Sequence, residues 1–323
     1  MSVTAAKGFA ASGVHAGIRK SKLDLAIVRS EERSTGAAMF TANRVQAAPV
    51  VISREHLELA EPQAVVVNSG NANAATGERG KLDARATAAE TARRLDLAAE
   101  QVLVLSTGVI GAPLPLHSVL GGLGAAVAAL SAEGGCGAAE AIMTTDTRPK
   151  QAVAGGPGFV AGGMAKGSGM IHPNLATMLA VVTTDYPLEP GEAIEFLRPA
   201  VEESFNSISV DGECSTNDTV VLLANGASQA PRDDDTFRSA LHAVCRDLAA
   251  QIVADGEGAT VVAEITVRGA ASTPEARAIA RRIATSPLVK TALFGRDATG
   301  AASSPPPARR RTTAATRTWT RSA

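Results

Sequence analysis

Short apolar runs and longer amphipathic stretches alternate along most of the chain. Apolar, β-branched runs bounded by turn residues are typical of strands, whereas apolar positions three or four residues apart are typical of helices. The predicted strands are 23–28, 47–52, 64–67, 102–105, 177–184, 219–223 and 261–267, with two more around a turn within 155–169. The predicted helices are 82–95, 114–130, a short one before residue 144, 192–204, 233–254 and one that begins at residue 273. Because strands and helices are interspersed throughout, the pattern predicts an α/β or α+β enzyme-like domain.

The clearest of these elements is the helix 233–254. Its apolar residues recur at steps of 4, 3, 4 and 4, which puts them on one stripe, and they are Phe237, Leu241, Val244, Leu248 and Ile252. Three aspartates, 233–235, stand at its start, where the helix dipole favours negative charge. The segment 68–73, by contrast, has the asparagine-rich and glycine-containing composition of a loop.

Composition narrows the class of protein. Hydrophobic residues make up 45% of the 323 residues and charged residues 20%, which is usual for a soluble globular protein. Aromatic residues make up only 3%, so the core must consist mainly of Val, Leu, Ile and Ala. A formal net charge of −1 gives no electrostatic reason to expect nucleic acid as a partner. The chain lacks the run of about 18 apolar residues that a membrane span needs, and its start lacks the apolar core of a secretory signal, so a cytoplasmic location without membrane contact is expected.

Metal and nucleotide motifs are not evident. The three cysteines are far apart, have no metal-site spacing and are odd in number, which argues against a disulfide framework. The five histidines do not cluster with cysteines or carboxylates, so no metal is expected. In the run Lys166-Gly167-Ser168 the lysine precedes the glycine, which is not the order of a phosphate-binding loop.

One glycine-rich run, 162–178, leads through Lys166 and a Pro-Asn turn to Thr177, which opens an apolar stretch. A threonine hydroxyl is a poor nucleophile until a base removes its proton, and the threonine's own α-amine can be that base once the chain is cut before it. Glycines upstream allow the unusual backbone geometry that such a cut needs. From spacing alone, a threonine that begins a strand after an ordinary turn remains the alternative.

The run 163–179 resembles the self-cleavage segment of the ornithine acetyltransferase family, the bifunctional glutamate N-acetyltransferases of arginine biosynthesis. Further segments resemble that family in the same order, so that the resemblance covers about residues 3–298. They are 41–50, 68–74, 106–111, 143–147, 255–260 and 290–297.

The resemblance implies a fold and an assembly. The fold is α+β, a four-layer α/β/β/α sandwich in which two mixed sheets pack between helices. Cleavage between Ala176 and Thr177 would give an α chain, 1–176, and a β chain that keeps the family pattern over 177–298. Members of the family assemble as α2β2 heterotetramers, and the same is expected here.

It also implies roles for individual residues. Thr177 would be the nucleophile that carries the acetyl group. Thr107 and Gly108, just after the apolar strand 102–105, would stabilise the oxyanion, and such donors contribute roughly 3 kcal/mol each. The substrate-binding positions would be Thr144, Lys166, Thr177 and Glu257. A lysine for a carboxylate and a glutamate for an ammonium group suit α-amino-acid ligands, although without the resemblance both charges would be interpreted as solvated loop residues.

The implied reaction is ping-pong and needs no cofactor. Acetyl passes from N2-acetyl-L-ornithine to Thr177, ornithine leaves, and glutamate takes the acetyl group. Acetyl-CoA is a second acetyl donor in bifunctional members, and the sequence does not show whether this chain uses it. Two alternatives stay open: an amidohydrolase or aminopeptidase of the same structural superfamily, in which water is the acceptor, and an inactive, truncated remnant.

The tail 299–323 departs from the family. It contains five arginines, three prolines and many Thr and Ala, with no Leu, Ile, Val, Phe, Asp or Glu, a composition that predicts disorder. Where the family continues with Asn-Trp-Gly, this chain has Thr299-Gly300-Ala301. Loss of one A from AAC-TGG-GGC gives ACT-GGG-GC, which encodes Thr-Gly-Ala. We therefore expect the tail to be a frameshift product that replaces the family's C-terminal part; a basic nucleic-acid-binding arm is the alternative.

Overall fold

The computed structural model describes residues 2–172, 178–297 and 313–320, the last of these as backbone only. The described strands form three sheets: one of four strands in the order β1-β2-β4-β5, one of five in the order β3-β9-β8-β7-β6, and the pair β10-β11. The bounds are β1 Phe9–Val14, β2 Leu25–Ser30, β3 Thr35–Phe40, β4 Ala64–Asn71, β5 Val102–Val109, β6 Lys150–Gly156, β7 Phe159–Lys166, β8 Leu179–Thr184, β9 Thr219–Ala224, β10 Val261–Arg268 and β11 Thr313–Thr320.

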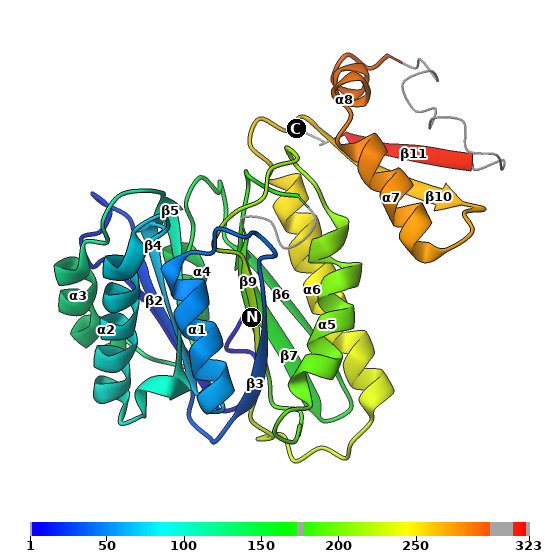
Figure 1. Ribbon diagram of the computed structural model, residues 1–323. Helices are drawn as coiled ribbons and strands as arrows, with labels where there is room; N and C mark the ends of the chain where they lie inside the picture. The colour runs from blue at the N-terminus through cyan, green and yellow to red at the C-terminus, as the bar shows by residue number, and fades with distance from the viewer. Residues whose placement is uncertain (1, 173–177, 298–312, 321–323) are drawn as a thin grey trace.

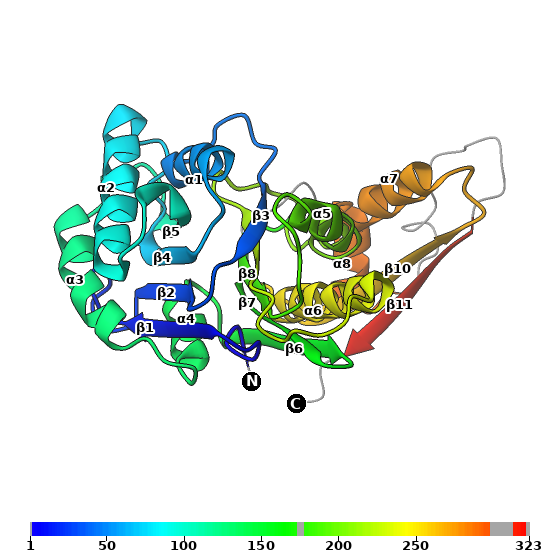
Figure 2. The same ribbon diagram turned by 90° about the horizontal axis from the view of Figure 1, so that it is seen from below.

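The two larger sheets pack face to face between two layers of helices (Figures 1 and 2). Helices α2 (Gly77–Leu95) and α3 (Leu116–Ala128) share an apolar cluster with the outer face of the four-stranded sheet. Helices α5 (Ala193–Glu203) and α6 (Asp234–Ala254) do the same for the five-stranded sheet. A third cluster fills the space between the sheets. The predicted α+β, four-layer α/β/β/α sandwich is therefore confirmed.

Because side chains alternate along a strand, each sheet contributes apolar side chains to two layers of the core. On β2, Leu25 and Ile27 face the helices, whereas Ala26 and Val28 face the other sheet. All four side chains are fully buried. Successive side chains of a strand point to opposite faces, so a strand that is buried on both faces is apolar at every position. The short helix α4 (Gly135–Ala141) packs beside β1 and contributes three alanines to the layer between the sheets.

The predicted strand 47–52 is wrong, because these residues lie at the start of helix α1 (Ala48–Leu59). Pro49 occupies its first turn, where the missing N–H costs nothing. The Ser53 hydroxyl donates to the Val104 carbonyl and accepts from the Val104 N–H, each at 2.8 Å, and His56 Nδ1 lies 2.8 Å from the Val102 carbonyl. The helix thus covers the open edge of β5, and this tertiary contact overrides the local β preference.

Most other predicted elements are confirmed with shifted ends. The predicted loop 68–73 is strand up to Asn71, because β4 and β5 continue their parallel pairing through Gly70 and Gly108. The apolar stripe of α6 is buried throughout, and Asp233 caps that helix by accepting from the Thr236 N–H at 3.1 Å. No helix of the described residues combines the length and apolarity that crossing a membrane requires.

The C-terminal elements lie beyond the end of α6 (Figure 1). They are β10, α7 (Thr273–Ala284), α8 (Pro287–Phe294) and β11. The disorder predicted for 299–323 does not hold for residues 313–320, which pair antiparallel with β10 as β11. Threonine, which recurs in this segment, is favoured in strands. The rest of the tail lies outside the described residues, and its origin by frameshift stays a prediction.

Truncating one residue of the α6 stripe tests its role. Leu248→Ala should lower the free energy of unfolding by about 2–5 kcal/mol, because Leu248 is fully buried and the substitution leaves a cavity. Urea unfolding measures the change. Leu82→Ala, on a helix residue that is 61% exposed, is the matched control and should have little effect. Equal losses in the two variants would contradict the assigned packing.

Candidate active site

The predicted cleavage residues, Ala176 and Thr177, lie outside the described residues, but both flanks of that segment are described. Upstream, β7 ends at Lys166, and downstream Met178 precedes β8. The two strands are antiparallel neighbours, with Lys166 opposite Leu179. The predicted substrate lysine therefore lies on the strand next to β8, directly opposite the residue two positions after the predicted nucleophile.

Thr107 and Gly108 lie at the far end of β5, at a break in strand register. Two residues of β5, 107 and 109, share Asn71 as pairing partner. Gly108 has a φ of +135°, and a methyl group in its place would lie 2.3 Å from the Gly70 carbonyl carbon. Only glycine fits such a close approach. Irregularities of this kind re-aim the backbone at the end of a strand, which suits the oxyanion role that the resemblance implies.

Lys166 is buried, with 2% of its surface exposed. Burial lowers the pKa of Lys166, the charges of Asp146, Asp218 and Glu257 oppose this shift, and Lys150 adds to it. Its interpretation as a solvated loop charge is therefore wrong. The surrounding carboxylates therefore counteract the effect of burial on the Lys166 ammonium.

Glu257 lies closer to solvent. Its side chain is exposed, as the solvated interpretation predicted. Its backbone N–H nevertheless donates to the Ser168 carbonyl at 2.7 Å, and a methyl group at Gly169 would lie 2.6 Å from the Glu257 carboxyl carbon. The carboxylate therefore lies against the chain that leaves β7, close to Lys166.

Thr144, the remaining substrate-binding prediction, is held by its backbone. Its N–H donates to Asp146 Oδ2 at 2.9 Å. Arg19 donates to the carbonyls of Met143 and Thr144 at 2.7 and 3.4 Å. The stem of Arg19 also packs on Gly70, where a methyl group would lie 2.8 Å from its Cγ. Arg19 therefore links the threonine loop to the strand that pairs with Thr107 and Gly108.

Lys150, at the start of β6, was not predicted as part of the site, yet it is the fully buried centre of an ion triad. Its ammonium donates to Asp146 Oδ1 at 2.6 Å and to Asp255 Oδ2 at 2.7 Å. Burial would raise the pKa of Asp146, but the charges of Lys166 and Lys150 hold that pKa below its usual range. The pKa of Asp255 is likewise lowered, chiefly by Lys150 and Thr147 against the effect of burial.

The triad joins three segments that carry substrate-binding predictions. Asp146 belongs to the Thr144 loop and also accepts the N–H of Gly167, next to Lys166, at 2.7 Å. Asp255 follows α6 and precedes Glu257 by two residues. No sequence motif marks this pairing, because Lys150 and Asp255 are 105 positions apart. Within the described ranges, no group of three or more His, Cys, Asp or Glu is placed to hold a metal ion.

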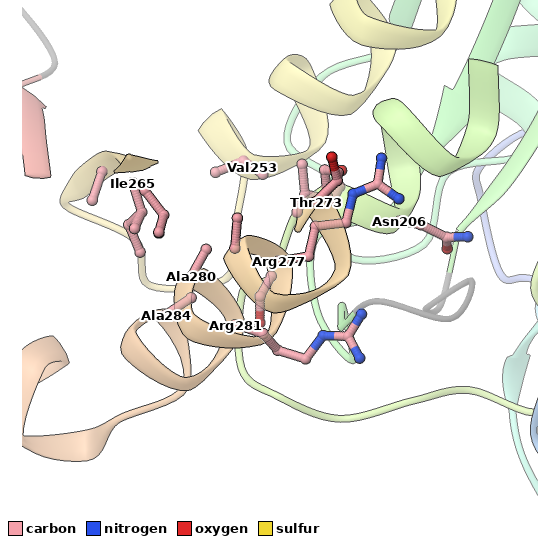
Figure 3. Close-up of a pocket in the computed structure, with 14 residues that line it drawn as sticks. Asn206, Val253, Ile265, Thr273, Arg277, Ala280, Arg281 and Ala284 are labelled. Carbon is pink, nitrogen blue, oxygen red and sulfur yellow. The ribbon is translucent and has the colours of Figure 1, made fainter. Parts of the chain in front are cut away.

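Cavities lie beside the C-terminal elements β10 and α7. One of about 330 Å³ is bounded by the turn Phe205–Ser207, the end of α6, β10 and α7, and none of the predicted site residues with a described position lines it (Figure 3). An adjoining cavity of about 280 Å³ is lined in part by Glu257. Of the predicted site residues that the structure describes, only Glu257 therefore reaches these cavities.

The buried triad should dominate local stability. Lys150→Met leaves two buried carboxylates unpaired, which costs about 3–5 kcal/mol at neutral pH. The paired carboxylates stabilise the fold above their unfolded pKa of about 3.9, and this contribution is lost as the pH falls through their lowered folded pKa values. The deficit of the variant should therefore shrink below about pH 4. Urea unfolding at about pH 7 and about pH 2.5 measures it.

The matched control is Lys81→Met, which removes a lysine paired at 2.7 Å with the exposed Glu78. It should change stability little at either pH, since exposed pairs contribute little. A pH-independent deficit in Lys150→Met would contradict the electrostatic account of the triad.

Comparison with known proteins agrees with the sequence resemblance. The ArgJ family model matches residues 10–300. The arginine biosynthesis bifunctional protein ArgJ of Geobacter sulfurreducens is 48% identical over 303 residues, which cover 90% of this chain and 77% of that protein. Its counterpart from Symbiobacterium thermophilum is 51% identical over 309 residues, covering 92% of this chain and 77% of that protein.

Among solved structures, the ornithine acetyltransferase of Mycobacterium tuberculosis, complexed with ornithine, is similar with 43% identity and a TM-score of 0.49, covering 53% of this chain and 94% of that chain. The family match and the curated relatives extend over nine tenths of the sequence. The chain belongs to the ArgJ family of arginine-biosynthesis acyltransferases.

Proposed function

We propose that this chain cuts itself between Ala176 and Thr177 and then transfers acetyl from N2-acetyl-L-ornithine to L-glutamate through an acetyl ester on Thr177. The observation that carries the proposal is the buried Lys166, which lies opposite the start of β8 with the Glu257 carboxylate beside the same segment. A cation and an anion on neighbouring segments suit the carboxylate and the ammonium group of an amino-acid substrate.

The proposed chemistry has two half-reactions. In the first, the Thr177 hydroxyl attacks the acetyl carbonyl while the Thr177 α-amine accepts its proton; the carbon–nitrogen bond then breaks as that proton passes to the nitrogen, and ornithine leaves. In the second, the neutral amine of glutamate attacks the ester and gives a proton to the Thr177 α-amine; the carbon–oxygen bond then breaks as that proton passes to the Thr177 oxygen, and N-acetylglutamate leaves. In both, Thr107 and Gly108 stabilise the oxyanion.

The two substrates share an α-carboxylate but differ in the charge of their side chains. Ornithine and glutamate each carry an α-carboxylate, for which Lys166 is the proposed partner, with Thr144 beside it. Glu257, at the border of a cavity, is placed for a cationic group. No cofactor is required. The relatives are called bifunctional, and acetyl-CoA is the candidate second acetyl donor.

The strand order supports continued association of the two fragments. In the five-stranded sheet, β8 and β9 belong to the fragment after the cut, and they lie between β3 and β7 of the fragment before it. Separating the fragments would break β-ladders on both sides and expose the apolar clusters that these strands bury. We propose that the fragments stay together and pair as an α2β2 assembly in the cytoplasm.

Intact-mass measurement tests the cleavage. The unmodified chain should give two fragments that separate before Thr177, and acetylornithine should add an acetyl group to the fragment that begins at Thr177. Thr177→Ala should give one uncut chain without acetyl transfer, whereas Thr177→Ser, which keeps the hydroxyl, should retain both at a lower rate. A single uncut, inactive unmodified chain would overturn the proposal, and release of free acetate in place of acetylglutamate would identify a hydrolase.

Substitution of Lys166 tests substrate binding. Lys166→Met should raise KM for both amino acids by roughly 10- to 100-fold, because a hydrogen bond between charged groups is lost. Because burial lowers the pKa of Lys166, kcat/KM of the unmodified enzyme should fall with rising pH well before the usual lysine pKa of about 10.4. Steady-state kinetics across pH measure both effects. Lys20→Met, at an exposed lysine, is the control, and equal KM values in the two variants would exclude this role.

A further inference from the structure

Two consecutive polar residues precede β9, at the end of the sandwich that carries the predicted site. Asn217 is 5% exposed and Asp218 is fully buried. Buried polar side chains destabilise a fold unless they are hydrogen-bonded, so the hydrogen-bond partners of Asn217 and Asp218 explain why both residues are tolerated. The partners of Asn217 lie at the end of one sheet, and the partner of Asp218 lies at the end of the other.

Asn217 reaches the four-stranded sheet. Its Nδ2 donates to the Ser106 carbonyl at 2.9 Å and to the Ala72 carbonyl at 2.6 Å. Ser106 immediately precedes the predicted oxyanion residue Thr107, and its own hydroxyl donates to Asn68 Oδ1 at 2.5 Å. The amide of Asn217 therefore fixes the ends of β4 and β5 just where Thr107 and Gly108 begin.

Asp218 reaches the start of β8. Its Oδ1 accepts the Met178 N–H at 3.0 Å, and Met178 is the residue that follows Thr177. The Met178 carbonyl in turn accepts the Thr219 N–H at 3.2 Å. Asp218 Oδ2 is buried and has no hydrogen-bond partner. Two consecutive residues just before β9 thus connect the predicted oxyanion strand to the chain adjoining the predicted nucleophile.

We propose that Asn217 and Asp218 form a positioning pair that sets the distance between the oxyanion donors and the residue before Met178. This inference rests on the proposed function of Thr177. The pair does not touch substrate: Asn217 acts through Ser106 and Asp218 acts through Met178. A misplacement of about 1 Å between reacting groups can slow a reaction about 100-fold, so the pair should govern kcat and self-cleavage and leave KM unchanged.

The two side chains serve opposite hydrogen-bonding needs, which makes isosteric exchanges informative. Asn217 must donate to two carbonyls, whereas Asp218 needs only one acceptor oxygen toward Met178. Asn217→Asp replaces the donor by an oxygen that faces two carbonyl oxygens. Asp218→Asn keeps an acceptor oxygen in place. The two exchanges are therefore expected to differ sharply in their effect on these hydrogen bonds, although both exchange only an amide and a carboxylate.

The control lies at the other end of the same strand. Asn225 follows β9 and donates through Nδ2 to the carbonyls of Lys7 and Gly8 at 3.1 and 3.3 Å, away from the predicted site. Asn225→Asp repeats the loss of an amide donor to two carbonyls. It should lower stability as a structural defect does and leave the rates unchanged.

The experiment measures self-cleavage by intact mass, kcat and KM for acetyl transfer, and urea unfolding for each full-length variant. Asn217→Asp should lower kcat and the cleavage rate by at least about 10-fold with KM unchanged, whereas Asn225→Asp should keep both rates within about threefold. If Asn217→Asp does not fold, Asp218→Ala against Asp218→Asn carries the same comparison. Both variants remove the charge that acts on Lys166, and only asparagine keeps an acceptor toward Met178, so the alanine variant should be at least about 10-fold slower than the asparagine variant.

The outcomes separate the two hypotheses. An unmodified chain that neither cuts itself nor transfers acetyl would overturn the proposed function and the positioning pair with it. An active unmodified chain whose Asn217→Asp variant matches Asn225→Asp in rates, or raises KM at constant kcat, would overturn the positioning pair alone. Equal rates for Asp218→Ala and Asp218→Asn would also overturn it.

Discussion

The apolar layer between the two large sheets is the constraint on which the remaining structure depends. Its side chains, such as Val28, Val67 and Val181, come from strands that are buried on both faces. Such packing holds each sheet at a fixed distance from the other and leaves no room for adjustment by sliding, since interiors are close-packed. The strand ends that carry Thr107 and Lys166 are therefore held relative to each other by the packing of the core.

Buried charged groups then fix the side chains of the predicted site, and their burial costs electrostatic free energy. Lys150 and Lys166 are both buried, and carboxylates lie near each of them. Asp146 is shared between them, because it accepts a hydrogen bond from Lys150 and opposes the effect of burial on the pKa of Lys166. A change in the charge of Asp146 would thus affect both lysines, so the proposed role of Lys166 depends on the triad.

Sequence patterns predict the parts of the molecule that follow from local periodicity. They fail where contacts between residues far apart in the sequence determine the structure. The stripe of α6 needs only the helical repeat, so it was predicted residue by residue. The helix α1 was missed, because its cause is the edge of β5, which no local pattern reveals. Lys166 and Glu257 look alike as charges in loops, but one is buried and the other exposed. Lys150 and Asn217 were not predicted at all, since each has partners more than 100 positions away in the sequence.

The strand order also bears on how a self-cleaving enzyme keeps its site after the cut. In the proposed reaction the chain breaks between β7 and β8, yet these strands remain neighbours because their pairing does not need the peptide link. Lys166 stays opposite Leu179, and the hydrogen bond from Met178 to Asp218 lies wholly within the new fragment. The proposed cleavage would therefore free an α-amine without releasing the strand that carries it, so a single fold would serve both as the proposed precursor and as the proposed acetyl-transferring enzyme.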